Sequence, residues 1–285
     1  MARLLKGKAA ADVINAELLD RAIALCEQQI APTLAIIRVG DDSSQIAYEN
    51  GAEKKAKSVA VSIEKFICPA DIEESDLLEI IKFINENDKI HGALLLQPLP
   101  AHLNDDAIRN ALAREKDMDC ISDDALGGLF LQKKDGFAPC TAESCLAILK
   151  HYDVPMKGKK VVVLGRSLVI GKPVAMMLMA ENATVTICHT KTEPDDLKLL
   201  CKQADIIIAA AGHQNTLTAE MVSPGQTIID VGINFNEEGK MVGDVDFEPV
   251  SEIVDAITPV PGGVGSMTTT ILMKHLVEAA ERLVK

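Results

Sequence analysis

Short apolar segments alternate with amphipathic segments along the chain, and this alternation restricts the fold more than any other feature of the sequence. In the first half, three segments are short, apolar and bounded by turn residues or polar residues, which predicts strands at residues 33–39, 61–66 and 91–97. Apolar residues at helical spacing predict helices at residues 10–29 and 75–87, and the capping side chains of residues 41–44 predict a polar helix that runs to about residue 58. Strands that alternate with helices form parallel βαβ units, so an α/β domain is expected here.

The second half repeats this pattern with sharper boundaries. Strands are predicted at residues 160–164, 184–188, 204–210, 227–231 and 256–257. A helix is expected over residues 171–180, with Pro173 in its first turn, and a last amphipathic helix over residues 268–284. The polar segment at residues 145–158, with Pro155 and Gly158, predicts a domain boundary. Two α/β lobes with a cleft between them are therefore expected, and such a cleft is the usual place for a small ligand.

Charge and hydropathy exclude several classes of function. The 285 residues contain 29 Lys and Arg against 42 Asp and Glu, a net charge of −13, so the basic surface that nucleic-acid binding needs is missing. No apolar run approaches the ~20 residues that cross a bilayer, and the N-terminus soon turns polar, which predicts a cytoplasmic protein with no membrane partner. The seven cysteines form no CxxC pair, so free thiols are expected and no metal site.

A glycine-containing turn follows the predicted strand at residues 160–164. It reads Gly165-Arg-Ser-Leu-Val-Ile-Gly171 and leads directly into a predicted helix. Small residues in such a turn let the backbone approach a pyrophosphate, and the N-terminus of the helix offers free N–H groups. The spacing differs from Gly-x-Gly-x-x-Gly, so an ordinary strand-to-helix turn without a ligand remains an alternative.

The end of the next predicted strand bears on the choice of cofactor. In an NAD-binding domain an acidic residue usually stands there to bind the adenosine ribose. Here the strand is followed by His189-Thr-Lys-Thr192 with no carboxylate. Arg166 and Lys191 are candidates to pair with a 2′-phosphate, and Thr190 to donate a hydrogen bond to it. The sequence therefore favours NADP slightly over NAD, although both cations are also compatible with a solvated loop.

Eight ordered motifs make the chain resemble the methylenetetrahydrofolate dehydrogenase/cyclohydrolase family over almost its whole length. They are Val39-Gly-Asp-Asp42, Leu94-Leu-Leu-Gln-Pro-Leu-Pro-Ala-His102, Lys116-Asp-Met-Asp119, Pro139-Cys-Thr141, Gly165-Arg-Ser167, Asp230-Val-Gly-Ile-Asn234, Gly243-Asp-Val-Asp-Phe247 and Ile257-Thr-Pro-Val-Pro-Gly-Gly-Val-Gly265. The resemblance implies an oxidoreductase of one-carbon metabolism, a homodimer that takes tetrahydrofolate derivatives as substrate. It would transfer a hydride from methylene-tetrahydrofolate to NAD(P), giving methenyl-tetrahydrofolate.

The resemblance also implies domains and site residues. An N-terminal catalytic, folate-binding domain is expected at residues 1–147, with the helix at 268–285 packing back on it, and a Rossmann-like NAD(P)-binding domain at residues 148–267. Catalytic and substrate-binding roles fall to Tyr48, Gln97 and Asp119, and further substrate contacts to Pro261, Gly262 and Gly263. Cofactor contacts fall to Gly165, Arg166, Ser167, Thr190 and Ile233.

One departure from the family pattern affects the expected activity. The family usually has Ser-x-x-Tyr-x-x-x-Lys on the first folate-side helix, and its lysine serves the cyclohydrolase step. Counted without gaps, the serine position holds Gln45 and the lysine position holds Ala52. An alanine methyl group cannot transfer a proton. Lys54 points to another side of the helix, and Lys55 lies about 10 Å beyond Tyr48 along the helix axis. The dehydrogenase activity is therefore expected and the cyclohydrolase activity is expected to be weak or absent.

Other functions remain open at this point. A bifunctional enzyme that uses a displaced lysine such as Lys55 is one alternative. A different two-lobed NADP enzyme, similar to shikimate dehydrogenase, is another, although no lysine aligns with Asp119 to form the acid–base pair of that class. The third alternative is a folate- or nucleotide-binding protein whose active site has decayed.

Overall fold

The structure, a computed structural model, describes residues 1–282 and divides the chain into two compact units. Residues 12–140 and 269–282 form one, the three-stranded unit; residues 1–11 and 141–268 form the other, the six-stranded unit. Residues 283–285, the end of the predicted last helix, lie outside the described residues.

A short parallel sheet organises the three-stranded unit. Its strands are β2 (Thr33–Val39), β3 (Ser62–Cys68) and β4 (Gly92–Leu95), in the order β3-β2-β4. The helices with residues in this unit are α1 (Gly7–Glu27), α2 (Ser43–Ser58), α3 (Glu74–Glu86), α4 (Asp105–Ala111), α5 (Asp123–Phe130) and α10 (Thr268–Arg282), with the short helix η1 (Arg114–Lys116). The sequence predicted these three strands and the helices α1, α2, α3 and α10 to within a few residues.

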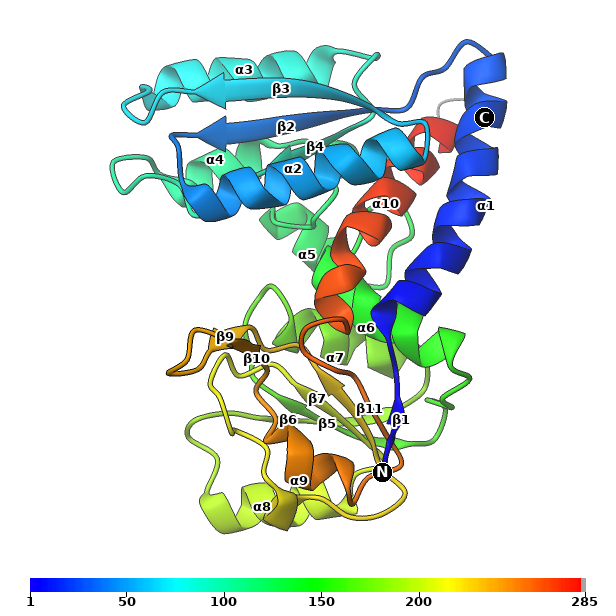
Figure 1. Cartoon of the computed structure of the whole chain (residues 1–285). Coiled ribbons are helices and arrows are strands. Elements are labelled where there is room, and N and C mark those ends of the chain that lie inside the picture. The colour runs from blue at the N-terminus through cyan, green and yellow to red at the C-terminus, as the bar shows by residue number, and fades with distance from the viewer. Residues whose placement is uncertain (283–285) are drawn as a thin grey trace. The chain divides into compact units, whose positions relative to one another are not determined.

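The two faces of β2 bury different kinds of side chain, because successive residues of a strand point to opposite faces of the sheet. Ala35, Ile37 and Val39 form a core with apolar residues of α3, while Arg38 on the other face bonds Glu49 of α2. Accordingly, α2 and α3 lie on opposite sides of the sheet (Figure 1). The acidic loop after β2 then begins α2, since the Asp42 carboxylate accepts the N–H groups of Ser44 and Gln45.

The six-stranded unit contains a wholly parallel sheet, as expected for a Rossmann-like domain. Its strands lie in the order β1-β11-β8-β7-β5-β6. Their bounds are β1 (Arg3–Leu4), β5 (Lys160–Leu164), β6 (Thr184–Cys188), β7 (Ile206–Ala209), β8 (Thr227–Asp230) and β11 (Ala256–Ile257). Strand β6 lies on one side of β5 and β7 on the other, so the strand order reverses at β5. Ligands of such sheets bind beyond the carboxyl ends of the strands at this point of reversal.

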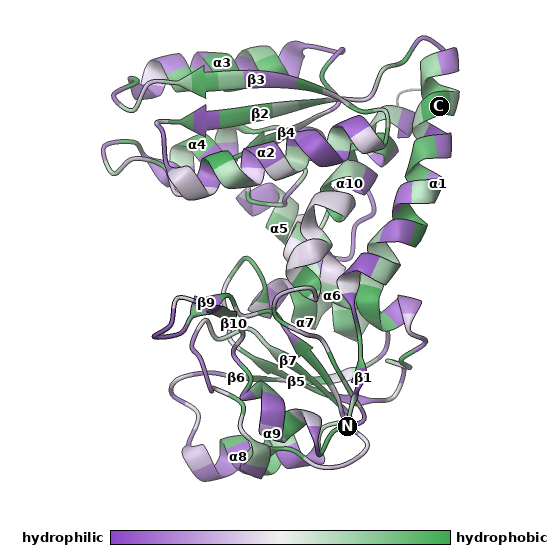
Figure 2. Ribbon diagram, viewed as in Figure 1, coloured by the Kyte–Doolittle hydropathy of each residue, from purple (hydrophilic) through white to green (hydrophobic). Residues whose placement is uncertain are grey.

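The remaining elements of this unit are α6 (Cys140–His151), α7 (Gly171–Ala180), α8 (Pro194–Gln203), α9 (Phe247–Ser251) and the short helices η2 (Ala219–Met221) and η3 (Val264–Ser266). A two-stranded antiparallel hairpin joins β9 (Asn234–Phe235) to β10 (Met241–Val242). The central strands are apolar apart from Lys160 at the start of β5, as Figure 2 shows for β5 and β7.

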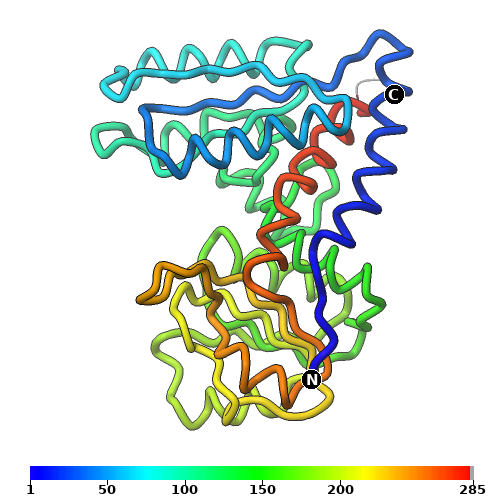
Figure 3. Tube along the Cα trace, in the orientation of Figure 1, coloured from blue at the N-terminus to red at the C-terminus, as the bar shows by residue number. Residues whose placement is uncertain are grey.

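The first residues of the chain belong to the six-stranded unit. Strand β1 pairs in parallel with β11, about 250 residues later in sequence, and Figure 3 traces the N-terminal segment to that edge of the sheet. Residues 1–11 and 141–147 thus lie outside the N-terminal domain expected at residues 1–147. The pairing of β1 could not be predicted, because a strand of two residues shows no periodic pattern. The boundary differs from the expected residue 147 because that residue lies within a continuous helix, α6.

No helix within residues 1–282 is both long and apolar enough to cross a membrane. All seven cysteines are free thiols, six of them buried, and Cys26 is exposed.

Candidate functional site

The turn after β5 brings its backbone close to the neighbouring strand connection. Gly165 has a φ of +120°, and a Cβ atom there would lie 2.1 Å from the carbonyl oxygen of Ala210. Gly171 begins α7, and a Cβ on it would lie 2.4 Å from the carbonyl oxygen of Gly165. Between them the Ser167 hydroxyl accepts the N–H groups of Ile170 and Gly171 at 3.2 and 3.4 Å. Only glycine fits at both ends of this turn, so the sequence signal at residues 165–171 has a steric cause.

A cavity of about 260 Å³ opens beside this turn, at the carboxyl ends of β5, β6 and β7; we call it the β5 cavity. It is lined by Leu164, Gly165, Arg166, Ser167, Cys188, His189, Thr190, Leu197, Ala210, Ala211, His213 and Thr216. Four of the five predicted cofactor residues therefore meet in one place. Each of the lining side chains is apolar, neutral or basic, which suits an anionic ligand.

A second cavity, of about 280 Å³, follows β8; we call it the β8 cavity. It is lined by Asp230, Val231, Gly232, Ile233, Met241, Pro259, Val260, Pro261, Gly262, Gly263, Val264, Gly265 and Ser266. Ile233, predicted to contact cofactor, and the loop at residues 261–263, predicted to contact substrate, thus share this cavity. The start of α1 packs directly against this loop, because a Cβ on Gly7 would lie only 2.2 Å from the carbonyl oxygen of Gly263.

Beneath the β8 cavity, Asp230 is 2% exposed and accepts three backbone N–H groups. They come from Gly232 at 3.0 Å, Asp244 at 2.9 Å and Val245 at 3.1 Å. Burial raises the pKa of the Asp230 carboxyl to about 6, against the opposing effect of these hydrogen bonds, and the nearby Asp244 also raises it. This residue belongs to one of the motifs that carry the family resemblance, but no function was predicted for it.

In the three-stranded unit, Tyr48 is half-buried on α2, and Gln97 is exposed in the loop that follows β4. A side chain that was not predicted from the sequence connects these two segments. Gln45 is 5% exposed, and its Nε2 donates to the carbonyl oxygen of Pro98 at 2.9 Å. The other amide atom of Gln45, Oε1, is buried without a hydrogen-bond partner among the described residues.

The third predicted residue of this unit, Asp119, is held at the start of α6. Its Oδ1 accepts the N–H of Cys140 at 2.8 Å, and burial raises the pKa of its carboxyl. The neighbouring Met118 carbonyl accepts hydrogen bonds from His275 Nδ1 at 2.8 Å and from the thiol of Cys140 at 3.4 Å. His275 lies on α10 and was not found from the sequence, because a buried histidine on a helix carries no signal of its own.

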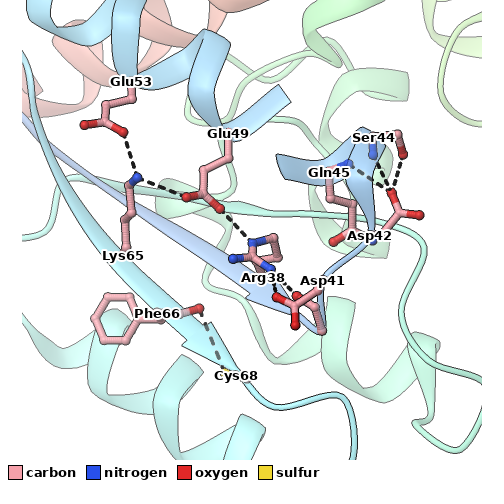
Figure 4. Close-up of polar contacts among 11 residues, drawn as sticks. Arg38, Asp41, Asp42, Ser44, Gln45, Glu49, Glu53, Lys65, Phe66 and Cys68 are labelled. Carbon is pink, nitrogen blue, oxygen red and sulfur yellow. Dashed lines mark hydrogen bonds and ion pairs between the residues drawn. The ribbon is translucent and has the colours of Figure 1, made fainter. Parts of the chain in front are cut away.

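An ion-pair network joins α2 to strands β2 and β3, as Figure 4 shows. Glu49 Oε2 accepts a hydrogen bond from Arg38 Nε at 2.8 Å, and Glu49 Oε1 forms an ion pair with Lys65 Nζ at 3.0 Å. Lys65 Nζ also lies 2.7 Å from Glu53 Oε2. Burial alone would raise the pKa of Glu49, but the hydrogen bonds from Lys65 and Arg38 lower it overall. The bonds to Glu53 and Glu49 raise the pKa of Lys65. Ala52 itself is fully buried on the same helix.

Two family profiles together match most of the chain. Residues 5–119 match the family profile described as tetrahydrofolate dehydrogenase/cyclohydrolase, catalytic domain. Residues 139–284 match the NAD(P)-binding domain of the same family.

Individual relatives cover the whole chain. The "Bifunctional protein FolD" of Carboxydothermus hydrogenoformans is 46% identical, over 99% of each chain. The crystal structure of the bifunctional enzyme FolD, a methylenetetrahydrofolate dehydrogenase/cyclohydrolase from Campylobacter jejuni, superposes with a TM-score of 0.96 at 39% identity, covering 99% of this chain and 100% of that one. The FolD of Trypanosoma brucei, solved with NADP and an inhibitor, gives a TM-score of 0.91 at 32% identity, covering 100% and 99%. The chain therefore belongs to the tetrahydrofolate dehydrogenase/cyclohydrolase family.

Proposed function

We propose that the protein oxidises methylene-tetrahydrofolate to methenyl-tetrahydrofolate, with NADP as the hydride acceptor. The observation that carries this proposal is the β5 cavity, where Gly165, Arg166, Ser167 and Thr190 meet at the point of strand reversal. Membership of the family sets aside the alternative of a shikimate-dehydrogenase-like enzyme. It also makes an active enzyme a better hypothesis than a decayed binding protein.

The residues of the β5 cavity fit a dinucleotide. Because Gly165 has no side chain, the turn packs closely against the carbonyl oxygen of Ala210, and both residues line the cavity together with Arg166, whose guanidinium can pair with a phosphate group. When bound, the nicotinamide ring supplies the position that accepts the hydride. The role of the protein is to fix the two reactants in a reactive orientation, because hydride transfer itself needs no protein acid or base.

The choice of NADP depends on charge. Arg166 lines the cavity, and the lining residues include no carboxylate among those that the structure describes. An adenosine ribose with a free 2′-hydroxyl is usually bound by an acidic residue, whereas a 2′-phosphate needs a basic one. The crystal structure of the Trypanosoma brucei relative contains NADP, which supports the same choice here.

We further propose that Tyr48, Gln97 and Asp119 bind and orient the folate, together with Pro261, Gly262 and Gly263. Asp119 is suited to this role because a carboxylate accepts two N–H bonds from the edge of a pterin ring. Its raised pKa, caused by burial, indicates that a ligand able to donate hydrogen bonds would stabilise the ionised form.

Cyclohydrolase activity is proposed to be weak or absent. Ala52 offers no ionisable group at the position where the family usually has lysine. Lys65, whose ammonium group bonds Glu49 and Glu53 on the same helix, has a raised pKa and is a poor proton carrier at neutral pH. A second candidate, a bifunctional enzyme, is favoured by the name of the Carboxydothermus hydrogenoformans relative, and it would need another group such as Lys55.

The substitution Ala52→Lys tests this assignment directly. If the missing ammonium group limits the second step, this variant should hydrolyse methenyl-tetrahydrofolate at least tenfold faster than the unmodified protein, in line with the usual ~10²-fold contribution of a positioned acid or base. Ala56→Lys, at another buried position one turn further along the same helix, is the matched control and should not raise the rate of hydrolysis. Rapid hydrolysis by the unmodified protein would instead establish the bifunctional enzyme.

A homodimer and a cytoplasmic location complete the proposal. The family resemblance supports the dimer, and β6 ends the six-stranded sheet with one edge unpaired by any described strand. Sedimentation equilibrium should give a mass of about twice 30.6 kDa. A mass of one chain at micromolar concentration would contradict the dimer.

A further inference from the structure

One buried carboxylate connects the walls of both cavities. Asp244 is fully buried in the loop between β10 and α9. Its Oδ2 accepts the N–H groups of Ala211 at 2.6 Å and Gly212 at 2.9 Å, in the loop that borders the β5 cavity. Its Oδ1 accepts Nδ2 of Asn234 at 2.9 Å, directly after Ile233 in the β8 cavity.

The backbone around Asp244 is fixed as well. Its N–H donates to Asp230 Oδ1 at 2.9 Å, and its carbonyl accepts the N–H of Leu217 at 3.2 Å. The fit against the neighbouring loop is tight, since a Cβ on Gly232 would lie 2.1 Å from Asp244 Oδ1. Glycine at position 232 is therefore required by the place that the Asp244 carboxylate occupies.

All three donors to this carboxylate are neutral amide groups, so the charge strengthens each bond without a competing ion pair. Hydrogen bonds to a charged group contribute more than neutral ones, and a buried donor that loses its acceptor is costly. The carboxylate thus holds two loops, residues 210–213 and 231–234, at a fixed separation. Within the described part of the chain, Asp244 is the side chain that bonds both of these loops.

The two cavities lie on the same edge of one sheet, beyond neighbouring strands β7 and β8. Adjacent strands are about 4.8 Å apart, and a dinucleotide consists of two nucleoside halves joined by a pyrophosphate. We propose that Asp244 is a positioning residue that sets the distance between the two cavities so that one dinucleotide occupies both. This inference rests on the proposed function, because it takes NADP as the ligand.

The test compares a whole ligand with half of it. Binding of NADP and of adenosine 2′,5′-bisphosphate, which has only the adenosine half, is measured by titration calorimetry. Asp244→Asn replaces one carboxylate oxygen, which accepts hydrogen bonds from amide groups, by an NH2 group that can only donate. Asn234→Ala removes the hydrogen bond that joins Asp244 to the wall of the β8 cavity and leaves its other bonds in place. Asp246→Asn is the control. It also removes one negative charge, two residues further on, but the Asp246 side chain makes no capping hydrogen bond to α9 that the change would remove.

We expect Asp244→Asn and Asn234→Ala to weaken NADP binding about tenfold or more, and binding of the half ligand less than about threefold. The control should bind both ligands as the unmodified protein does. Equal losses for both ligands would show that Asp244 only maintains the β5 cavity, and unchanged NADP binding would show no role; either result overturns the inference. If Asp244→Asn does not fold, Asn234→Ala decides alone. An unmodified protein that binds neither ligand overturns the proposed function itself.

Discussion

At the scale of single residues, steric fit decides the geometry of the β5 cavity. Gly165 was predictable, because a glycine between a buried strand and a helix is typical of a tight turn. The partners of Asp230 and Asp244 were not predictable, since their donors lie up to 33 residues away in sequence and no local pattern records such bonds. Gln45 and His275 were missed for the same reason: their contacts are tertiary.

The substitution Gly165→Ala should abolish measurable NADP binding and lower the free energy of unfolding by about 1–3 kcal/mol. Two effects combine, a positive φ and a Cβ 2.1 Å from a backbone oxygen. Gly158→Ala is the matched control, because Gly158 has a φ of +75° but open space around its Cβ position. Ligand titration and urea denaturation of both variants measure the difference. Equal effects of the two substitutions would contradict the steric origin of the loss.

Asp230 should make stability depend on pH. The pKa of its carboxyl is about 6 in the folded protein, above the ordinary value of 3.8, so the folded state binds the proton more tightly than the unfolded state. The free energy of unfolding should therefore fall as pH rises from about 4 to about 6, by roughly 3 kcal/mol from this group alone. Asp230→Asn should remove this contribution, which denaturation of both proteins across that range measures. Parallel pH profiles would refute the assignment.

At the scale of elements, apolar runs and helical spacing predicted the parallel strands and most of the long helices, since burial on both faces leaves a clear pattern. Of the two-residue strands, β11 was predicted, whereas β1, β9 and β10 were missed, because a pair of residues shows no period and these segments are exposed or only partly buried. The contacts that hold α2 on the sheet could not be predicted from the sequence either. The sequence predicted a polar helix, and nothing in it indicated that Arg38, Glu49 and Lys65 bind this helix to the sheet.

This network predicts unequal effects of two similar substitutions on α2. Glu49→Ala leaves the buried guanidinium of Arg38 without its main partner and should lower the free energy of unfolding by about 3 kcal/mol. Glu53→Ala removes a more exposed carboxylate, whose ion pairs are screened by water, and should lower it much less than Glu49→Ala does. Because Glu49 holds α2 on the sheet and Tyr48 lies on the same helix, the first variant should also raise KM for the folate. Urea denaturation and steady-state kinetics test both; equal destabilisation would contradict the role given to Glu49.

At the scale of the whole molecule, the chain combines a nucleotide-binding unit with a second α/β unit, each with its own parallel sheet. The sequence predicted two α/β domains and the family, but the position of residues 1–11 in the six-stranded unit depends on pairing with β11, which only the fold reveals. The same holds for the β8 cavity, where residues predicted for cofactor and for substrate lie together.

The most direct test of the proposed function follows NADPH and methenyl-tetrahydrofolate together in one reaction that starts from methylene-tetrahydrofolate and NADP. We expect both products to appear in equal amounts and methenyl-tetrahydrofolate then to persist, decaying no faster than in a solution without protein. No formation of NADPH would contradict the dehydrogenase assignment, and methenyl-tetrahydrofolate consumed as fast as NADPH appears would contradict the loss of the second activity.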